Sequence, residues 1–236
     1  TTAQLAALTT AQLAKMETDD IAAITTAQIT ALTTAQIAAL TTAQAVAISE
    51  DQVAVLKTAQ LAALTTANFV EMSTDQLAAI TTAQISALTT AQVSALTEDQ
   101  AVSLSEDQVA ALKTAQVAAL STANLAAMSE DQVAALTTAQ VTALTTAQIV
   151  ALTEDQVAAM GTAQLAALTT AQLAKMETDD IAAITTDQIT ALKTAQMEAL
   201  TTAQVVALSE DQVATLTTAQ LAALTTAQLA KMETND

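Results

Sequence analysis

Large aliphatic residues recur along this chain in a fixed pattern of eight residues. Position 8 of each octad is always Leu, Ile or Met, and position 5 is Leu, Ile or Val in most copies. Positions 6 and 7 are mainly Ala, whereas positions 1 to 4 are small or polar and position 4 is nearly always Gln. The octads follow one another from Thr1 without an insertion or a deletion and end in a partial octad, 233–236. A fixed short period of this kind is typical of a repeat architecture.

Two regular structures do not fit an eight-residue period. In one continuous α-helix, eight residues turn through roughly 800°, about 80° more than two full turns, so the apolar stripe would wind around the helix. In a strand, positions 5 and 8 would lie on opposite faces, and Ala, Gln and Leu are weak strand formers. A tight β-solenoid also needs turn residues, and the chain has one Gly and no Pro.

One short helix per octad does fit the pattern. In the segment Ser49 to Gln52, Ser49 is a good N-cap, the two acidic residues that follow it suit the first turn, and Gln52 completes a capping box. The residue before the cap is apolar, as is the fourth helical residue, so Leu136 and Val141 can form a hydrophobic staple around Thr137. We therefore expect a helix over positions 2 to 8 and a corner at the next cap.

A single octad is too small to fold alone. Burial of its two large side chains contributes roughly 3–6 kcal/mol, whereas ordering eight residues costs roughly 12 kcal/mol. Octads must therefore stack on both sides, as in other solenoid proteins. We predict one all-α solenoid domain over residues 1–236, a superhelix of very short helices with positions 5 and 8 inside and positions 1 to 3 outside. The Gln at position 4 is expected to be the partner of the cap and to bond between neighbouring octads.

A longer period lies above the octad. Val at position 6 occurs in four octads that each precede an acidic octad: Val46, Val102, Val150 and Val206. Most successive members of this series of valines and acidic octads lie seven octads apart. Residues 9–24 and 169–184 are identical, which indicates duplication of a seven-octad block. An alternative structural explanation is that about 3.5 octads make one superhelical turn, so that octads seven apart return to one face.

Composition excludes most kinds of catalytic and binding site. The chain has no His, Cys, Trp, Tyr or Arg, so it lacks an imidazole base and a thiol nucleophile. We expect no enzyme activity, no cofactor and no small-molecule substrate. A formal net charge of −18 disfavours nucleic acid as a partner. No apolar run is long enough to span a membrane.

Two clusters of acidic residues are the candidates for a metal site. Carboxylate oxygens are the ligands that Ca²⁺ prefers, but the clusters lack the Gly of a tight calcium loop. Favourable charge at the start of a helix and solubility explain them without a metal. We therefore expect no metal site, and the weak candidates are Glu17, Asp19, Asp20, Glu177, Asp179 and Asp180.

The phrase from Leu136 to Val141, Leu-Thr-Thr-Ala-Gln-Val, recurs with close variants throughout the chain. It resembles the octapeptide arrays of very large, adhesin-like surface or secreted proteins of alphaproteobacteria. The resemblance implies an extracellular or cell-surface stalk, filament or matrix role, and it carries over no site residues. We expect a fragment of a longer array that self-associates into fibres or bundles. The alternative is a binding or adhesion module in which the periodic acidic octads, with or without calcium, present a ligand surface.

Overall fold

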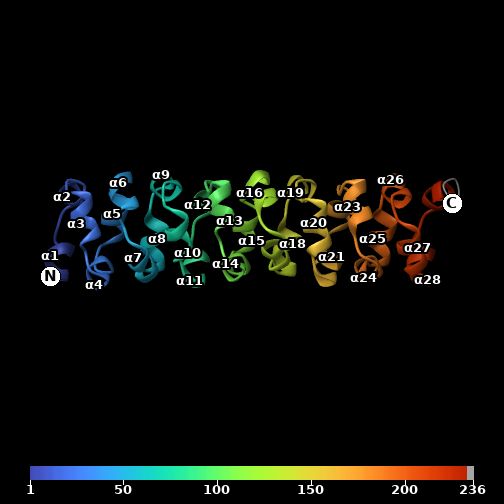
Figure 1. Ribbon diagram of the computed structural model, residues 1–236, viewed down its shortest axis with the longest axis horizontal. Coiled ribbons are helices and arrows are strands. Elements are labelled where there is room, and N and C mark those ends of the chain that lie inside the picture. The colour runs from blue at the N-terminus through green and yellow to red at the C-terminus, as the bar shows by residue number, and fades with distance from the viewer. Residues whose placement is uncertain (233–236) are drawn as a thin grey trace. The chain divides into compact units, whose positions relative to one another are not determined.

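The computed structural model describes residues 1–232, and within that range the chain is helical with no strand. Each octad forms one helix, and every helix begins at position 2 of its octad, directly after the Thr, Ser or other cap residue (Figure 1). The predicted all-α solenoid of very short helices is therefore confirmed. The chain forms two compact units, Thr1–Ala127 and Met128–Asp236, which are described separately below. The expected single-domain organisation stays a prediction.

The first unit contains α1 to α16. Their bounds are α1 Thr2–Ala6, α2 Thr10–Leu13, α3 Thr18–Ala22, α4 Thr26–Ile29, α5 Thr34–Ala38, α6 Thr42–Val46, α7 Glu50–Val55, α8 Thr58–Ala63, α9 Thr66–Val70, α10 Thr74–Ala78, α11 Thr82–Ile85, α12 Thr90–Ser94, α13 Glu98–Val102, α14 Glu106–Ala111, α15 Thr114–Val117 and α16 Thr122–Ala127.

The second unit contains α17 to α29. Their bounds are α17 Glu130–Ala134, α18 Thr138–Ala143, α19 Thr146–Val150, α20 Glu154–Ala159, α21 Thr162–Ala167, α22 Thr170–Leu173, α23 Thr178–Ala183, α24 Thr186–Ala191, α25 Thr194–Ala199, α26 Thr202–Val206, α27 Glu210–Thr215, α28 Thr218–Ala223 and α29 Thr226–Met232.

The helices are shorter than the expected span of positions 2 to 8. Most end between positions 5 and 7, and two consecutive extended residues then make the corner. Leu56, at position 8, has φ −54° and ψ 138°, and Lys57, the next cap, has φ −65° and ψ 149°. No residue in the described part of the chain has a positive φ. The corner therefore uses conformations open to any L-amino acid, which explains how the chain turns without Gly or Pro.

The core consists of positions 5 and 8, as predicted. Leu61 and Leu64 of octad 57–64, for example, are 0% and 3% exposed. Positions 1 to 3 are exposed in almost every octad. The pattern differs from the prediction at position 4, where the polar residue is also buried. From Gln36 onward, each described residue at this position is at most 5% exposed. A buried amide requires hydrogen-bond partners for all its polar atoms.

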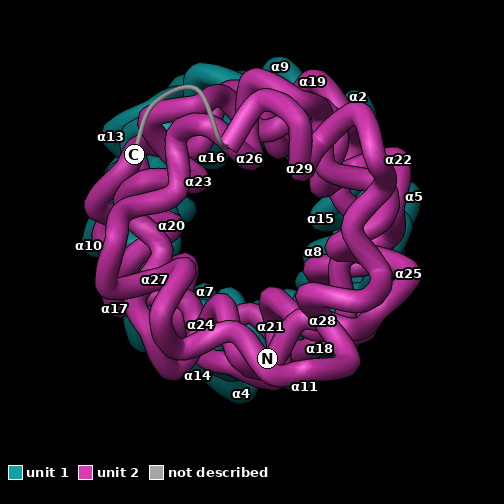
Figure 2. The backbone as a smooth tube through the Cα atoms, turned by 90° about the vertical axis from the view of Figure 1, so that its right-hand side faces the viewer, with its two compact units in different colours: residues 1–127 teal, residues 128–236 magenta. Residues whose placement is uncertain are grey.

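Helices pack in a regular register within each unit. In unit 1, α1 packs against α4 and α4 against α7, and the same three-octad step relates α5 to α8 and α11 to α14. In unit 2, the step relates α17 to α20, α21 to α24 and α26 to α29. Figure 2 shows the chain of each unit winding around a ring, so helices three octads apart meet on successive turns.

Candidate interaction surface

The side chain of Gln92 joins two turns of the superhelix. Its Oε1 accepts the backbone N–H of its own cap, Thr89, at 2.9 Å, and its backbone N–H donates to Thr89 Oγ1 at 3.1 Å. Its Nε2 donates to the carbonyl oxygens of Leu61 at 3.0 Å and Leu64 at 2.9 Å. One buried amide therefore caps the start of its own helix and binds the end of the helix four octads earlier.

The same arrangement recurs through both units, and we call it the glutamine ladder. The carbonyl at position 8 follows the end of a helix and has no intrahelical donor, so an amide from the next turn satisfies it. In unit 1, Gln116 bonds in this way to Ile85 and Leu88, and in unit 2, Gln196 bonds to Leu165 and Leu168. Members with both cross-turn bonds include Gln36, Gln44, Gln60, Gln84, Gln92, Gln108, Gln116, Gln164, Gln172, Gln196, Gln204, Gln220 and Gln228.

The ladder defines the superhelical register. Sequence reasoning expected the Gln to bond between neighbouring octads, but its acceptors lie four octads earlier. Helix packing relates octads three apart, as α5 and α8 show, whereas Gln60 of α8 bonds to Ile29 and Leu32 of the octad that contains α4. One turn must therefore take between three and four octads. The hypothesis of about 3.5 octads per turn falls within this interval.

Two octads carry Asn in place of Gln at position 4. Asn68 and Asn124 donate to the position-8 carbonyls of Leu40 and Leu96 at 2.8 and 2.9 Å. The side chain is one methylene shorter, and neither Asn donates to the position-5 carbonyl or accepts the N–H of its cap; the oxygen of Asn68 instead accepts the Thr42 hydroxyl at 3.3 Å. Of the three hydrogen bonds that Gln makes in the ladder, the bond to position 8 is therefore the one that the shorter amide retains.

The predicted acidic candidates occupy two different environments. In the first cluster, Glu17, Asp19 and Asp20 are all exposed. In the second, Glu177 and Asp179 are exposed, whereas Asp180 is 3% exposed and its carboxylate accepts the backbone N–H of Glu177 at 3.1 Å. Burial raises the pKa of Asp180 to about 6. Among residues 1–232 no group of three acidic side chains is arranged to hold a metal ion.

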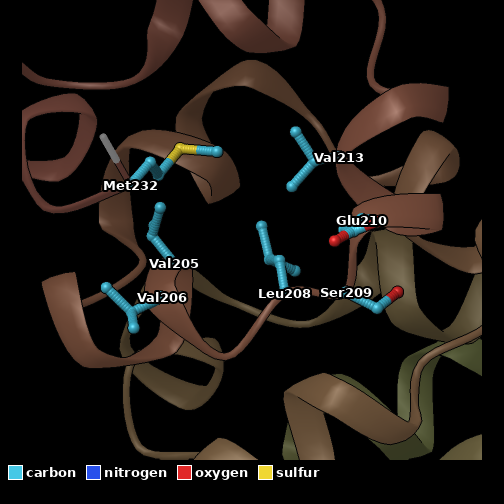
Figure 3. Close-up of a pocket in the computed structure, with 7 residues that line it drawn as sticks. All are labelled: Val205, Val206, Leu208, Ser209, Glu210, Val213 and Met232. Carbon is cyan, nitrogen blue, oxygen red and sulfur yellow. The ribbon is translucent and has the colours of Figure 1, made fainter. Parts of the chain in front are cut away.

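Two shallow pockets occupy matching places in the repeat. The pocket in unit 1 has a volume of about 280 Å³ and combines Val46 and Ile48 with Ser49, Glu50 and Asp51 of the following acidic octad. The pocket in unit 2 has a volume of about 270 Å³ and is lined by Val205, Val206, Leu208, Ser209, Glu210, Val213 and Met232. Figure 3 shows Met232 on one side of this pocket and Val213 and Leu208 on the other.

Both pockets include a position-6 valine from the longer period. Position 6 is exposed in most octads and is usually Ala, but the four valines leave large apolar side chains at the surface: Val46 is 47% exposed, Val102 46%, Val150 41% and Val206 38%. In unit 1, α6 packs against α9, and Gln100 of α13 bonds to the Val70 carbonyl of α9 at 2.9 Å. Val46, Val70 and Val102 therefore lie on octads of three successive turns. The sequence analysis singled out Val46, Val102, Val150 and Val206, but not the pockets beside Val46 and Val206.

Comparison with known proteins identifies the repeat. No curated protein matches the chain. No helix of the described residues is both long enough and apolar enough to cross a membrane. A family model described as the ALTTAQ repeat matches eight segments, most of which overlap: 13–50, 53–90, 69–106, 102–138, 134–162, 157–194, 173–210 and 181–218. These segments together cover most of the chain, which is a tandem-repeat protein and belongs to the ALTTAQ repeat family.

Proposed function

We propose that this chain is a structural protein that forms an extracellular or cell-surface rod, stalk or filament and associates end to end. The observation that carries the proposal is the glutamine ladder. Within each unit, most octads that have an octad four places earlier bind it through the same donors and acceptors, so octads can be added without a change of geometry. The length of the array then depends on the number of octads, and its negative charge keeps it in solution.

The first and last described octads of this 236-residue segment carry complementary hydrogen-bonding groups. At one end, Gln4 and Gln12 are exposed and have no octad four places earlier in this chain, so their Nε2 groups lack the ladder's acceptors. At the other end, no described side chain donates to the carbonyl oxygens of Leu216 and Leu224. The position-5 side chain of Leu221 is 39% exposed there, although most residues at this position are fully buried. The first octads of a second copy, placed where the next turn would lie, would donate hydrogen bonds to these carbonyl oxygens and bury the Leu221 side chain.

The test is the association state of the 236-residue chain. Sedimentation velocity over a range of concentrations, with negative-stain images of the same samples, should show species that grow in length but not in width. The variant Gln4→Glu/Gln12→Glu/Gln28→Glu keeps the capping acceptors but replaces the donors with carboxylates that repel carbonyl oxygens. This variant should remain monomeric.

A matched control separates loss of the donors from added charge. The variant Thr2→Glu/Thr10→Glu/Thr26→Glu adds the same charge to the same three octads, at a position that is Glu in α7 and α14. It should associate like the wild-type chain. A wild-type chain that stays monomeric at every concentration, or association that all variants share, would contradict end-to-end assembly.

The two matching pockets favour one alternative, an extracellular binding or adhesion module. Each pocket places an exposed apolar surface beside the carboxylates of an acidic octad, namely Val46 beside Glu50 in unit 1 and Val206 beside Glu210 in unit 2. Such a surface suits a ligand with a positive charge next to an apolar group. Calcium is the simplest cationic ligand to test.

Calorimetric titration of the chain with calcium, together with its thermal unfolding in calcium and in chelator, tests the metal version of this alternative. Absence of heat and an unchanged unfolding temperature would dismiss it. We expect no enzyme activity under either function because the chain offers no His, Cys or Arg side chain. Turnover of a substrate by this segment alone would overturn that expectation.

A further inference from the structure

Asp180 interrupts the glutamine ladder in unit 2. It occupies position 4 of octad 177–184, and its side chain is buried where the amide of Gln lies in other octads. The register of Gln172 and Gln196 places the carbonyl oxygens of Ile149 and Leu152 opposite position 180. Among the hydrogen bonds of the described residues, none joins Asp180 to these two carbonyls. An ionised carboxylate has only acceptors, so it cannot take the place of the amide.

The protonated form of Asp180 can make the missing bond. Asp and Asn have the same length and shape, and Asn124 at the same position of its octad donates to the Leu96 carbonyl at 2.9 Å. Asn68 does the same to Leu40 at 2.8 Å. A protonated carboxyl group carries one O–H donor, which can reach the equivalent carbonyl of Leu152. Its second oxygen still accepts the backbone N–H of Glu177, as the structure shows.

The surroundings of Asp180 disfavour its charge. Burial has the largest effect on its pKa, which it raises, and the nearby carboxylates of Glu177, Glu154 and Asp179 raise it further. The bond from the Glu177 N–H opposes these effects. The helix α20, which packs against α23, also carries Asp155. The helix α26, which packs against the other side of α23, carries no ionisable side chain, and neither does the octad that contains α19. The resulting pKa of about 6 is more than two units above the ordinary value of 3.8.

We propose that Asp180 is a proton-controlled joint, meaning a contact between two turns of the solenoid that depends on its protonation. When protonated, Asp180 forms a hydrogen bond between octads 177–184 and 145–152. When ionised, it cannot form this bond, and the contact between the two octads weakens. In the closed, protonated state, Asp180 makes a bond to Leu152 that is equivalent to the bond from Asn124 to Leu96 in unit 1. The open state buries a carboxylate against two carbonyl oxygens. A shift towards mild acid therefore tightens one turn of unit 2 and leaves the turns held by Gln unchanged.

The sequence provides a matched control for this joint. Residues 9–24 repeat residues 169–184, so Asp20 has the same local sequence as Asp180 but is exposed and has no octad four places earlier in this chain. The variants Asp180→Asn and Asp20→Asn remove one charge from identical segments. Asp180→Asn should fold, because Asn124 is accommodated at the same position in unit 1.

Hydrogen exchange of the full chain at about pH 4.5 and about pH 8 tests the proposal, with each variant compared with wild type at the same pH. Amides of residues 177–184 should be up to about 100-fold more protected in Asp180→Asn than in wild type at the higher pH, since two pKa units correspond to that factor. At the lower pH the difference should shrink to less than about 10-fold, because Asp180 is then mostly protonated in the folded chain. Asp20→Asn should match wild type at both. A carboxyl ¹³C titration should place the pKa of Asp180 near 6.

Three results would contradict the proposal that Asp180 is a proton-controlled joint. The first is a protection difference between Asp180→Asn and wild type that is equal at both pH values, because this would reflect packing alone. The second is the same response from Asp20→Asn. The third is an ordinary pKa for Asp180 in the folded chain, because its carboxyl would then stay ionised at mildly acidic pH.

Discussion

Gln108 donates its side-chain amide to the backbone carbonyl of Ile80 at 2.6 Å, across 28 residues of sequence. The same amide donates to the Leu77 carbonyl at 3.0 Å and accepts the backbone N–H of Ser105 at 2.8 Å. The start of α14 and the end of the octad that contains α10 are therefore held by one side chain. Because both ends of these short helices carry unpaired backbone groups, this side chain contributes to local and tertiary structure together.

Removal of the Gln108 amide should destabilise unit 1 strongly. Gln108→Leu leaves one partly buried N–H and two buried carbonyls without this partner, so we expect a loss of about 2–4 kcal/mol in the free energy of unfolding. Gln12→Leu is the matched control, because Gln12 is exposed and makes only the capping contacts. It should cost at most about 1 kcal/mol. Urea unfolding followed by circular dichroism measures both, and equal losses would contradict the importance of the cross-turn bonds.

Replacement of Asn124 with Gln should stabilise the chain. The longer amide can reach the carbonyl of Val93 as well as that of Leu96, and its oxygen can accept the N–H of Ser121. Leu125, the adjoining core residue, is of the type found beside Gln in other octads. We expect a gain of about 0.5–1.5 kcal/mol, seen as a higher urea midpoint. A lower midpoint would mean that this octad cannot accommodate the extra methylene.

Gly161 is a cap residue without a side chain, and a hydroxyl group at this position should increase the stability of the chain. Its φ of −70° and ψ of 154° suit any residue, and a Cβ would meet Gln164 Oε1 at an ordinary contact distance of 3.5 Å. Gly161→Ser should gain about 0.5–1.5 kcal/mol from its new bond to the Gln164 N–H and from the reduced entropy of the unfolded chain. Gly161→Ala isolates the entropic part. If both variants gain equally, the hydroxyl does not act as a cap.

Two leucines at position 5 should respond differently to truncation. Leu125 is 0% exposed, whereas Leu221 is 39% exposed near the end of unit 2. Leu125→Ala should cost about 2–5 kcal/mol because it leaves a cavity, and Leu221→Ala should cost about 1 kcal/mol. Urea denaturation of the two variants under conditions where the chain is monomeric gives the comparison. A similar loss for both would show that the outer octads are packed as tightly as the inner ones.

The pH dependence of stability should carry a contribution from Asp180 of known sign. Its folded pKa, about 6, is above the ordinary value of 3.8, so folding favours its protonated form. Its contribution is therefore most favourable below about pH 4 and is lost as the pH rises to about 6, by at most about 3 kcal/mol. Asp180→Asn should remove this component from the pH profile of the urea midpoint. A profile unchanged by the substitution would contradict the raised pKa.

Some of this structure could be predicted from short stretches of sequence. The segment Ser49 to Gln52 contains the cap, the favourable charges and the Gln of a capping box, and α7 begins there as expected. The alternation of Leu61 and Leu64 with small or polar residues was sufficient to identify the core. These features depend on contacts within one octad or on the apolar character of a side chain, and both can be read from neighbouring residues.

These patterns led to the expectation that the Gln at position 4 bonds between neighbouring octads, but they did not indicate that its acceptors lie four octads earlier. One signal of a donor role was present. Glu serves a capping box as well as Gln does, yet no octad has Glu at this position. An ionised carboxylate cannot donate, and among the complete octads only Asp20 and Asp180 place one at this position. The prevalence of amides therefore indicates that a donor is needed elsewhere. The sequence contains no information on how far apart donor and acceptor lie.

The sequence by itself determined one short capped helix per octad, its buried aliphatic pair and the turn without Gly or Pro. Only the tertiary structure decided that helices pack three octads apart, that amides reach four octads back, and that Asp20 is exposed while its duplicate Asp180 is buried. The physical reason is that capping and burial preferences act over a few residues, whereas the rise and rotation of each corner accumulate over several octads before two turns meet.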